Sequence, residues 1–202
     1  MSKVEQIEEN LKKLKELGVA EGEIIERCES KILSLKNGEL SYVFIKNIKD
    51  ADVKAHGKVV IESKDPELNY YFVKNVKGAD VMAHGKVVIE SKNAKWNYKF
   101  ARFVEGADIK AHEKVVIESK DPEFNFYFLR YVEGADIIAH GQVIIESKDS
   151  IFNRRFKEDF EDEYKILKRN NLIDDTYNFL DDALDEMIKE NNEENKSMQK
   201  RF

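Results

Sequence analysis

A 28-residue unit that recurs in tandem constrains the fold of this 202-residue chain more than any other feature. Four clear copies occupy residues 47–74, 75–102, 103–130 and 131–158, and a diverged fifth copy, residues 19–46, aligns with them without a gap. A fixed period of this size is typical of repeat architectures, in which each unit buries its apolar face against the next one. Matching positions of the copies are therefore expected to share a structural role.

The first half of each unit predicts a short helix, here called helix A. Asp52 stands where an N-cap belongs, ahead of an apolar stripe through Val53, His56 and Val60 at helical spacing. The same aspartate recurs as Asp80, Asp108 and Asp136. We therefore expect helix A to begin directly after this aspartate in each clear copy.

The second half predicts another helix, helix B. Asp65-Pro66 supplies an N-cap followed by a proline in the first helical position, where its missing N–H costs nothing. The helix is expected to bury Leu68, Phe72 and Val76, and Gly78 is expected to allow the left-handed turn that ends it. Lys64, Lys92, Lys120 and Lys148 are expected to be solvent-exposed residues of the turn between the two helices.

The fold expected from this pattern is an all-α solenoid of about five helix-turn-helix repeats with capping helices at both ends. The expected divisions are an N-terminal capping helix at 1–18, the repeats at 19–158, acidic C-terminal capping helices at 159–190 and a flexible tail at 191–202. Phe160, Tyr164 and Leu167 are expected to prolong the last helix B. An alternative takes Lys-Val-Val-Ile-Glu-Ser as a β-strand of a leucine-rich-repeat-like coil, although the pattern L-x-x-L-x-L-x-x-N is absent.

Two polar residue types recur at fixed positions of the unit. They are the histidines His56, His84, His112 and His140 and the asparagines Asn69, Asn97, Asn125 and Asn153. Packed helices lie about 10 Å apart, whereas zinc holds imidazole nitrogens at about 2.0 to 2.1 Å, so adjacent histidines cannot share an ion. We expect structural ladders instead, in which each ring bonds the neighbouring unit and each amide binds turn backbone in the next one. A modest pH sensitivity near about pH 6 would accompany the histidines.

No catalytic, cofactor or metal motif is complete in this chain. His112-Glu113 begins the zinc-protease motif H-E-x-x-H, but Val116 stands where the second histidine is needed. The single cysteine, Cys28, can form neither an internal disulfide nor a zinc site with a second thiol. Because a catalytic site is normally unique in its chain and every polar group here recurs, we expect no enzyme and no cofactor.

Binding sites in repeat arrays are expected where an exposed position varies between copies. One side of helix B offers such positions, and together they form a basic stripe that carries tyrosines: Tyr71, Lys74, Lys99, Arg102, Tyr127, Arg130 and Arg155. Arginine pairs with carboxylate or phosphate, and tyrosine adds contact area at low entropic cost. A plain solvated face, in which lysine and arginine stems cover apolar surface, is the alternative.

The charge and hydropathy of the chain limit the cellular location and the kinds of partner that we expect for it. The net charge of −6 comes entirely from residues 157–202, which hold 14 acidic and 8 basic residues. No segment approaches the roughly 20 consecutive apolar residues of a membrane span, and the start lacks a secretory signal pattern, so a cytoplasmic location is expected. The acidic run could act as a cap or imitate the phosphate charge of DNA.

Units of the form Gly-Ala-Asp-x-x-x-His-x-x-Val-Ile-Glu-Ser-Lys-Asp-Pro-x-x-Asn-Tyr-x-Phe resemble short two-helix repeat arrays of uncharacterised bacterial and phage proteins. That resemblance, over residues 19–158, implies the helical-repeat fold and no common activity. The function expected from the whole pattern is a non-catalytic scaffold that binds a macromolecule, most readily a protein. Two alternatives stay open: a nucleic-acid binder acting through the basic stripe, and a phage-encoded inhibitor of a host defence or nucleic-acid enzyme acting through its acidic end.

Overall fold

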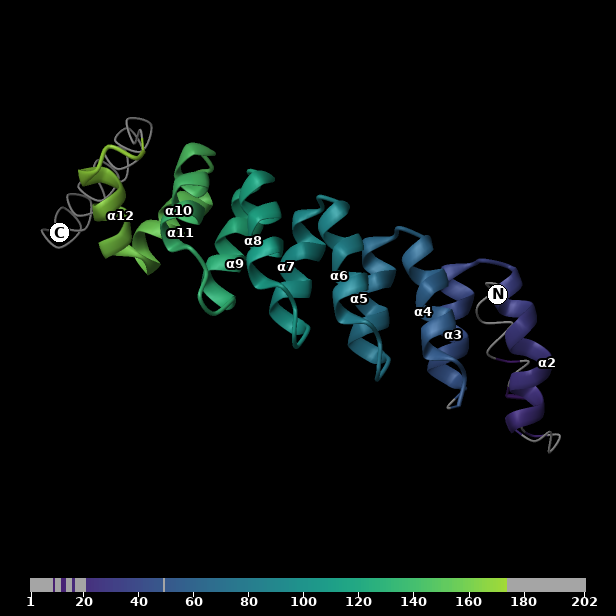
Figure 1. Ribbon diagram of the computed structural model, residues 1–202. Coiled ribbons are helices and arrows are strands. Elements are labelled where there is room, and N and C mark those ends of the chain that lie inside the picture. Colours follow the sequence, from purple (N-terminus) through teal and green to yellow (C-terminus); the bar gives the residue numbers. More distant parts are fainter. Residues whose placement is uncertain (1–8, 10–11, 14–15, 17–20, 49, 174–202) are drawn as a thin grey trace, which may run out of the picture. The chain divides into compact units, whose positions relative to one another are not determined.

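The computed structural model describes residues 9, 12–13, 16, 21–48 and 50–173, and within these ranges its secondary structure is entirely helical (Figure 1). The helices A are α2 (Glu21–Ser34), α4 (Val53–Glu62), α6 (Val81–Glu90), α8 (Ile109–Glu118) and α10 (Ile137–Glu146). The helices B are α3 (Gly38–Asn47), α5 (Pro66–Asn75), α7 (Ala94–Phe103), α9 (Pro122–Tyr131) and α11 (Ser150–Asp159), and α12 (Glu161–Arg169) follows them. The predicted all-α repeat fold is confirmed, and the β-strand alternative is wrong because Lys-Val-Val-Ile-Glu is helical in each clear copy or its counterpart.

Helix A begins at the aspartate that the sequence indicates. Oδ1 of Asp52 accepts a hydrogen bond from the backbone N–H of Ala55 at 3.0 Å, which satisfies one of the free donors of the first turn. Asp80, Asp108 and Asp136 repeat the same bond three residues on. The diverged copy lacks this aspartate, and its helix α2 starts earlier and is 14 residues long instead of 10.

Helix B begins and ends as predicted. Oδ1 of Asp65 accepts from the backbone N–H groups of Glu67 and Leu68, and Pro66 occupies the first helical position. The helix ends before Val76, after which Gly78 adopts a φ of +85°. This left-handed conformation is the one that glycine adopts at no steric cost.

The turn from helix A to helix B uses a lysine in the same left-handed region. Lys64, Lys92, Lys120 and Lys148 have φ values of 55°, 54°, 55° and 58°, and Lys36 of the diverged copy has 48°. The serine before the lysine stabilises this turn, because Ser63 Oγ donates to the Val60 carbonyl and accepts a hydrogen bond from the backbone N–H of Asp65. The predicted turn lysines are exposed, and the structure adds that each carries backbone strain.

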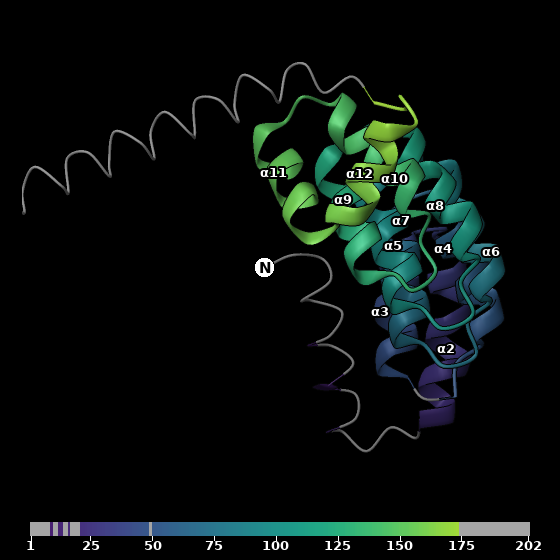
Figure 2. The same cartoon turned by 90° about the vertical axis from the view of Figure 1, so that its left-hand side faces the viewer.

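The described chain divides into two compact units, residues 1–116 and 117–202. In the first unit the helices B α3, α5 and α7 lie side by side, and α4 contacts α6 in a second layer (Figure 2). One phenylalanine of each helix B fills the space between the layers. Phe44, Phe72 and Phe100 have no exposed surface, and burying such a side chain stabilises the fold by roughly 1.5–3 kcal/mol.

The second unit contains α12, which follows the last helix B. The sequence predicts that the last helix B continues through Phe160, but the structure ends α11 at Asp159 and starts α12 at Glu161. Phe160 leaves the helical conformation, with φ −135° and ψ 50°, so α12 turns back to pack on α10. Leu167 is fully buried there, and a Cβ at Gly141 would lie 2.9 Å from its Cδ1.

Only this part of the predicted ends is described. The expected N-terminal capping helix falls almost wholly outside the described residues, as do positions 174–190 of the acidic caps and the tail at 191–202.

Candidate functional site

The recurring histidines and asparagines bond each other across successive repeats. In the first unit, Nδ1 of His84 lies 2.7 Å from Oδ1 of Asn69, and His112 has the same distance to Asn97. In the second unit, His140 and Asn125 repeat this contact at 2.7 Å. Each ring therefore reaches one repeat back in the chain.

The amide nitrogen stays within its own repeat, which differs from the expected bond to the next one. Nδ2 of Asn69 donates to the carbonyl of Val60 at 3.1 Å and to that of Asp65 at 2.7 Å. These two acceptors fix the amide orientation, so its oxygen faces the ring of His84. Because that oxygen can only accept, Nδ1 of His84 carries the proton and Nε2 is left as an acceptor.

The imidazoles of the first unit are buried and held neutral. His84 stacks on Phe72 with 4.7 Å between ring centroids, and burial lowers its pKa to about 4. His112 stacks on Phe100 at 4.7 Å, and burial lowers its pKa to about 4 as well. In each case the nearby N-cap aspartate acts in the opposite direction but is outweighed by desolvation.

The first junction between repeats departs from this pattern. Ser41 stands at the asparagine position, and neither its buried Oγ nor Nδ1 of His56 has a hydrogen-bond partner within the described residues. Nε2 of His56 lies 3.4 Å from Oε1 of Glu29, which already accepts the backbone N–H of Asp52 at 2.7 Å. Burial lowers the pKa of His56, and the Glu29 carboxylate partly opposes that shift.

None of these polar groups forms a metal centre. Within the described residues, no cluster of three or more His, Cys, Asp or Glu side chains has the spacing to hold an ion. His84, His112 and His140 are instead each bonded to one asparagine of the preceding repeat.

The helix-B surface of the first unit, defined here as Tyr71, Lys74, Trp96, Lys99, Arg102 and Phe103, joins cations to aromatic rings. Nζ of Lys99 lies 4.5 Å from the ring centroid of Trp96, and Tyr71 meets the same indole edge-on at 5.9 Å. Lys74 and Arg102 approach the ring of Phe103 at 5.1 Å and 4.7 Å. All four predicted residues of this unit thus gather around two rings.

The helix-B surface of the second unit, defined as Tyr127, Arg130, Tyr131, Arg155 and Asp159, surrounds a cleft of about 330 Å³. Arg130 pairs with the carboxylate of Asp159, and its guanidinium lies 6.0 Å from the Tyr131 ring. Burial, together with the charge of Glu123 and a hydrogen bond to it, raises the pKa of Tyr127. Tyr127, Arg130 and Arg155, the predicted residues of this unit, all line the cleft.

Two residues of these surfaces were not predicted from the sequence. Phe103 and Tyr131 are each 47% exposed, although both end a helix B that is otherwise amphipathic. Their position changes from Asn75 to Phe103, Tyr131 and Asp159 along the repeats. That variation is the signal that could have identified them.

No helix in the described ranges is long and apolar enough to cross a membrane. The acidic segment from 174 onward, considered as a DNA imitation, lies outside the described residues. Comparisons with family models, with curated proteins and with solved structures return no match to this chain.

Proposed function

We propose that this chain is a non-catalytic binding protein that recognises an acidic protein partner through its helix-B surfaces. The observation that carries the proposal is the repeated placement of cations against aromatic rings, namely the buried Trp96 and the half-exposed Phe103. Lys99 over Trp96, and Lys74 and Arg102 beside Phe103, are the instances in the first unit. Such cations are already positioned before a partner arrives, which lowers the entropic cost of binding.

The helix-B surfaces contain the residue types that contribute most to binding energy in protein interfaces. Tryptophan, tyrosine and arginine are enriched among the side chains whose truncation costs most binding energy. Phe103 and Tyr131 are large apolar groups left half exposed beside the cations. A partner that presents carboxylates flanking an apolar side chain would satisfy both parts of the surface.

A carboxylate is favoured over a nucleic-acid phosphate because the second unit already binds one. Two repeats later, Asp159 occupies the position next to Arg130 that Phe103 occupies next to Lys74. The chain as a whole is also acidic, with a net charge of −6, which opposes the binding of a polyanion without sequence contacts.

The test is a matched pair of charge-reversal variants. Lys74→Glu with Arg102→Glu alters the helix-B surface, and Lys64→Glu with Lys92→Glu makes the same charge change at turn lysines outside it. Each protein, immobilised, is incubated with extract of the source cells, and retained proteins are identified and then purified for titration. We expect one acidic partner to be retained by the unaltered chain and by the turn variant, and to bind the helix-B variant at least tenfold more weakly.

Two outcomes would contradict the proposal. The first is a partner that binds both variants equally well. The second is oligonucleotide binding by the unaltered chain whose affinity falls steeply with salt and is lost in the helix-B variant, which would establish a nucleic-acid surface instead.

A further inference from the structure

The layer of helices A contains two equivalent grooves in the first unit. The groove between α4 and α6 has a volume of about 610 Å³, and the groove between α6 and α8 has about 440 Å³. Each residue that lines the second groove follows a residue that lines the first by one repeat, as His112 follows His84 and Gly85 follows Gly57. Both volumes fall within the range of about 300–1,000 Å³ that is usual for ligand sites.

A glycine in the middle of helix A opens each groove. Glycine costs a helix roughly 0.5–1 kcal/mol relative to alanine, so its presence needs a reason. At Gly141 the reason is packing, because a Cβ would lie 2.4 Å from Cζ of Phe156. At Gly57 a Cβ would meet its nearest neighbours, His84 Nε2 and Phe72 Cε1, at 3.4 Å, which is ordinary contact. Packing therefore does not require glycine at position 57, whereas close approach of another molecule would. At Gly85 a Cβ would lie 3.2 Å from Cε1 of Phe100, so packing also favours glycine there.

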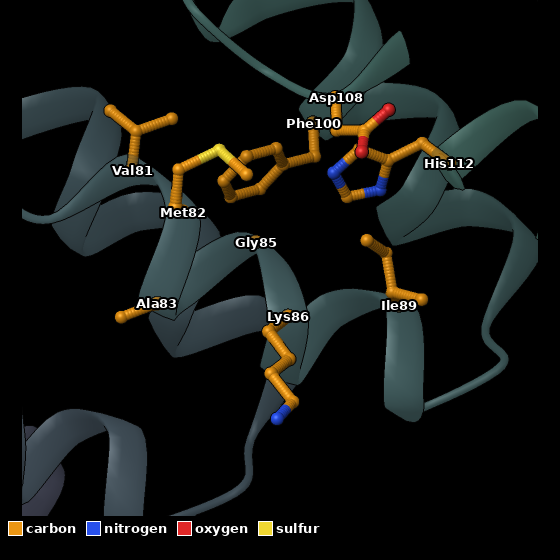
Figure 3. A pocket seen from close by; sticks show the side chains of 9 residues that line it. All are labelled: Val81, Met82, Ala83, Gly85, Lys86, Ile89, Phe100, Asp108 and His112. Atoms are coloured by element: carbon orange, nitrogen blue, oxygen red, sulfur yellow. The ribbon is translucent and has the colours of Figure 1, made fainter. Parts of the chain in front are cut away.

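A buried acceptor without a partner lies beneath each glycine. Nε2 of His84 and of His112 are buried and make no hydrogen bond within the described residues. Their Nδ1 protons are committed to Asn69 and Asn97, so each Nε2 presents a lone pair. Figure 3 shows the ring of His112 reaching across from α8 toward Phe100 and Gly85.

The rest of the lining is largely apolar, although Lys86 and Asp108 also line the groove between α6 and α8, and Asp52, Lys54, Lys58 and Asp80 line the other one. Val81, Ile89 and the 61% exposed Met82 flank the groove between α6 and α8, and Val53 and Ile61 flank the other one. An exposed methionine adapts its shape to an aromatic guest and makes favourable contacts with the ring. The grooves thus offer a largely apolar site with one buried acceptor beneath the glycine.

We propose that each of these helix-A grooves receives a tryptophan side chain from a protein partner. Indole has a large apolar body and a single N–H that donates and does not accept, which matches a groove with an acceptor and no donor at its base. The imidazole nitrogen is already shielded from water, so its bond to the indole is formed without a further desolvation cost. Side-chain movements at the rim, which are common when interfaces form, give the N–H access. The proposal concerns the helices A and does not rest on the helix-B surfaces.

The experiment uses N-acetyltryptophanamide as the probe and the complete chain labelled with ¹⁵N. We expect saturable shifts of the backbone amides of Gly57 and Gly85, together with movement of the Nε2 resonances of His84 and His112. A counterpart in which benzothiophene replaces indole keeps the shape and lacks the N–H, and we expect it to bind at least tenfold more weakly. Free indole is titrated in parallel, and we expect N-acetyltryptophanamide to bind at least as tightly as free indole.

The variant Gly57→Ala provides the internal control. Its methyl group fits at contact distance and favours the helix, so the fold is retained, as circular dichroism would verify. We expect it to abolish the shifts at position 57 and at His84 while those at Gly85 and His112 persist. Equal binding of the benzothiophene probe, shifts confined to the helix-B surfaces, binding of free indole alone, or unchanged binding to the alanine variant would each overturn the proposal.

Discussion

Oδ1 of Asn97 accepts a hydrogen bond from Nδ1 of His112, fifteen residues later, at 2.7 Å. The same asparagine donates to the carbonyls of Val88 and Asn93, both at 2.9 Å. One side chain therefore connects α6 and the N-cap of α7 to the ring of the next repeat. All of these groups are buried or partly buried, which makes the asparagine the polar centre of the junction.

Replacing Asn97 with alanine should therefore destabilise the protein by about 2–4 kcal/mol. The change leaves the buried imidazole N–H of His112 without its acceptor, which costs roughly 1–3 kcal/mol. It also removes two hydrogen bonds to the carbonyls of Val88 and Asn93, which keep other donors, at about 1 kcal/mol or less each. Denaturant unfolding followed by circular dichroism measures the loss. Asn75→Ala, which removes a bond to Tyr42 at an exposed site, should change the free energy of unfolding by less than about 1 kcal/mol and serves as the control.

The first junction offers the reverse change. Ser41→Asn restores the residue that the other junctions use, giving the Nδ1 of His56 an acceptor. We expect the free energy of unfolding to rise by about 1 kcal/mol, the usual net value of such a hydrogen bond. Unfolding curves of the two proteins under identical conditions test this, and a decrease would mean that the space beside Ser41 cannot hold the amide.

Acid should weaken the fold through the buried histidines. The folded-state pKa values of His84 and His112 are about 4, below the value of 6.5 for the unfolded chain, so the unfolded state binds more protons between these pH values. The contribution of these histidines to the free energy of unfolding is therefore fully present above about pH 6.5. It is lost as the pH drops to about 4, and the loss is about 3 kcal/mol for each histidine. The fall begins near the pH 6 expected from sequence but extends well below it.

Urea unfolding at a series of pH values between 7 and 4 checks this dependence. The variant His84→Gln keeps a hydrogen-bonding side chain that does not titrate, and its stability should decline less steeply over the same range. A slope equal to that of the unaltered chain would contradict the assignment of this proton to His84.

The strained turn lysines predict a gain in stability. Lys92 has a φ of 54°, and Lys92→Gly should stabilise the protein by about 1 kcal/mol because glycine adopts this conformation without steric cost. Lys86→Gly makes the same change in the middle of α6, where it should cost about 1 kcal/mol. Thermal unfolding of both variants should therefore show shifts of opposite sign.

The helix-A glycines predict a contrast between two alanine variants. Gly141→Ala should destabilise the protein by about 1–3 kcal/mol, because its Cβ would overlap Cζ of Phe156 at 2.4 Å. Gly57→Ala should be neutral or stabilising by up to about 1 kcal/mol, since its contacts are at 3.4 Å. Denaturant midpoints measure both, and equal losses would show that both glycines are required by packing.

Helix boundaries were predictable because local chemistry decides them. Asp52 and Asp65 cap their helices through bonds to residues two or three positions on, which depend on nothing distant in the chain. The break at Phe160 was not predictable in this way. Its apolar periodicity continues into Leu167, whereas the structure starts a separate helix that places this leucine against Gly141.

The candidate sites show the same division. The basic stripe was visible because Lys74 and Arg102 occupy a repeated position, but their contact with Phe103 depends on the distance between adjacent helices B. The amide of Asn69 binds its own repeat because Val60 presents its carbonyl there, a detail of backbone direction that residue spacing does not reveal. The relation of the glycines at positions 57 and 85 to His84 and His112 is purely three-dimensional, so residue spacing does not reveal it.

The bond between each asparagine and the following histidine has the same form at the Asn69–His84 and Asn97–His112 junctions. A duplicated copy of residues 75–102 inserted after position 102 would supply a histidine for Asn97 and an asparagine for His112. The junctions on both sides of the inserted copy would therefore each keep an asparagine–histidine bond. Length is thus an adjustable property of this protein. Recombination between copies can change how many surfaces it displays without any new solution to the problem of folding.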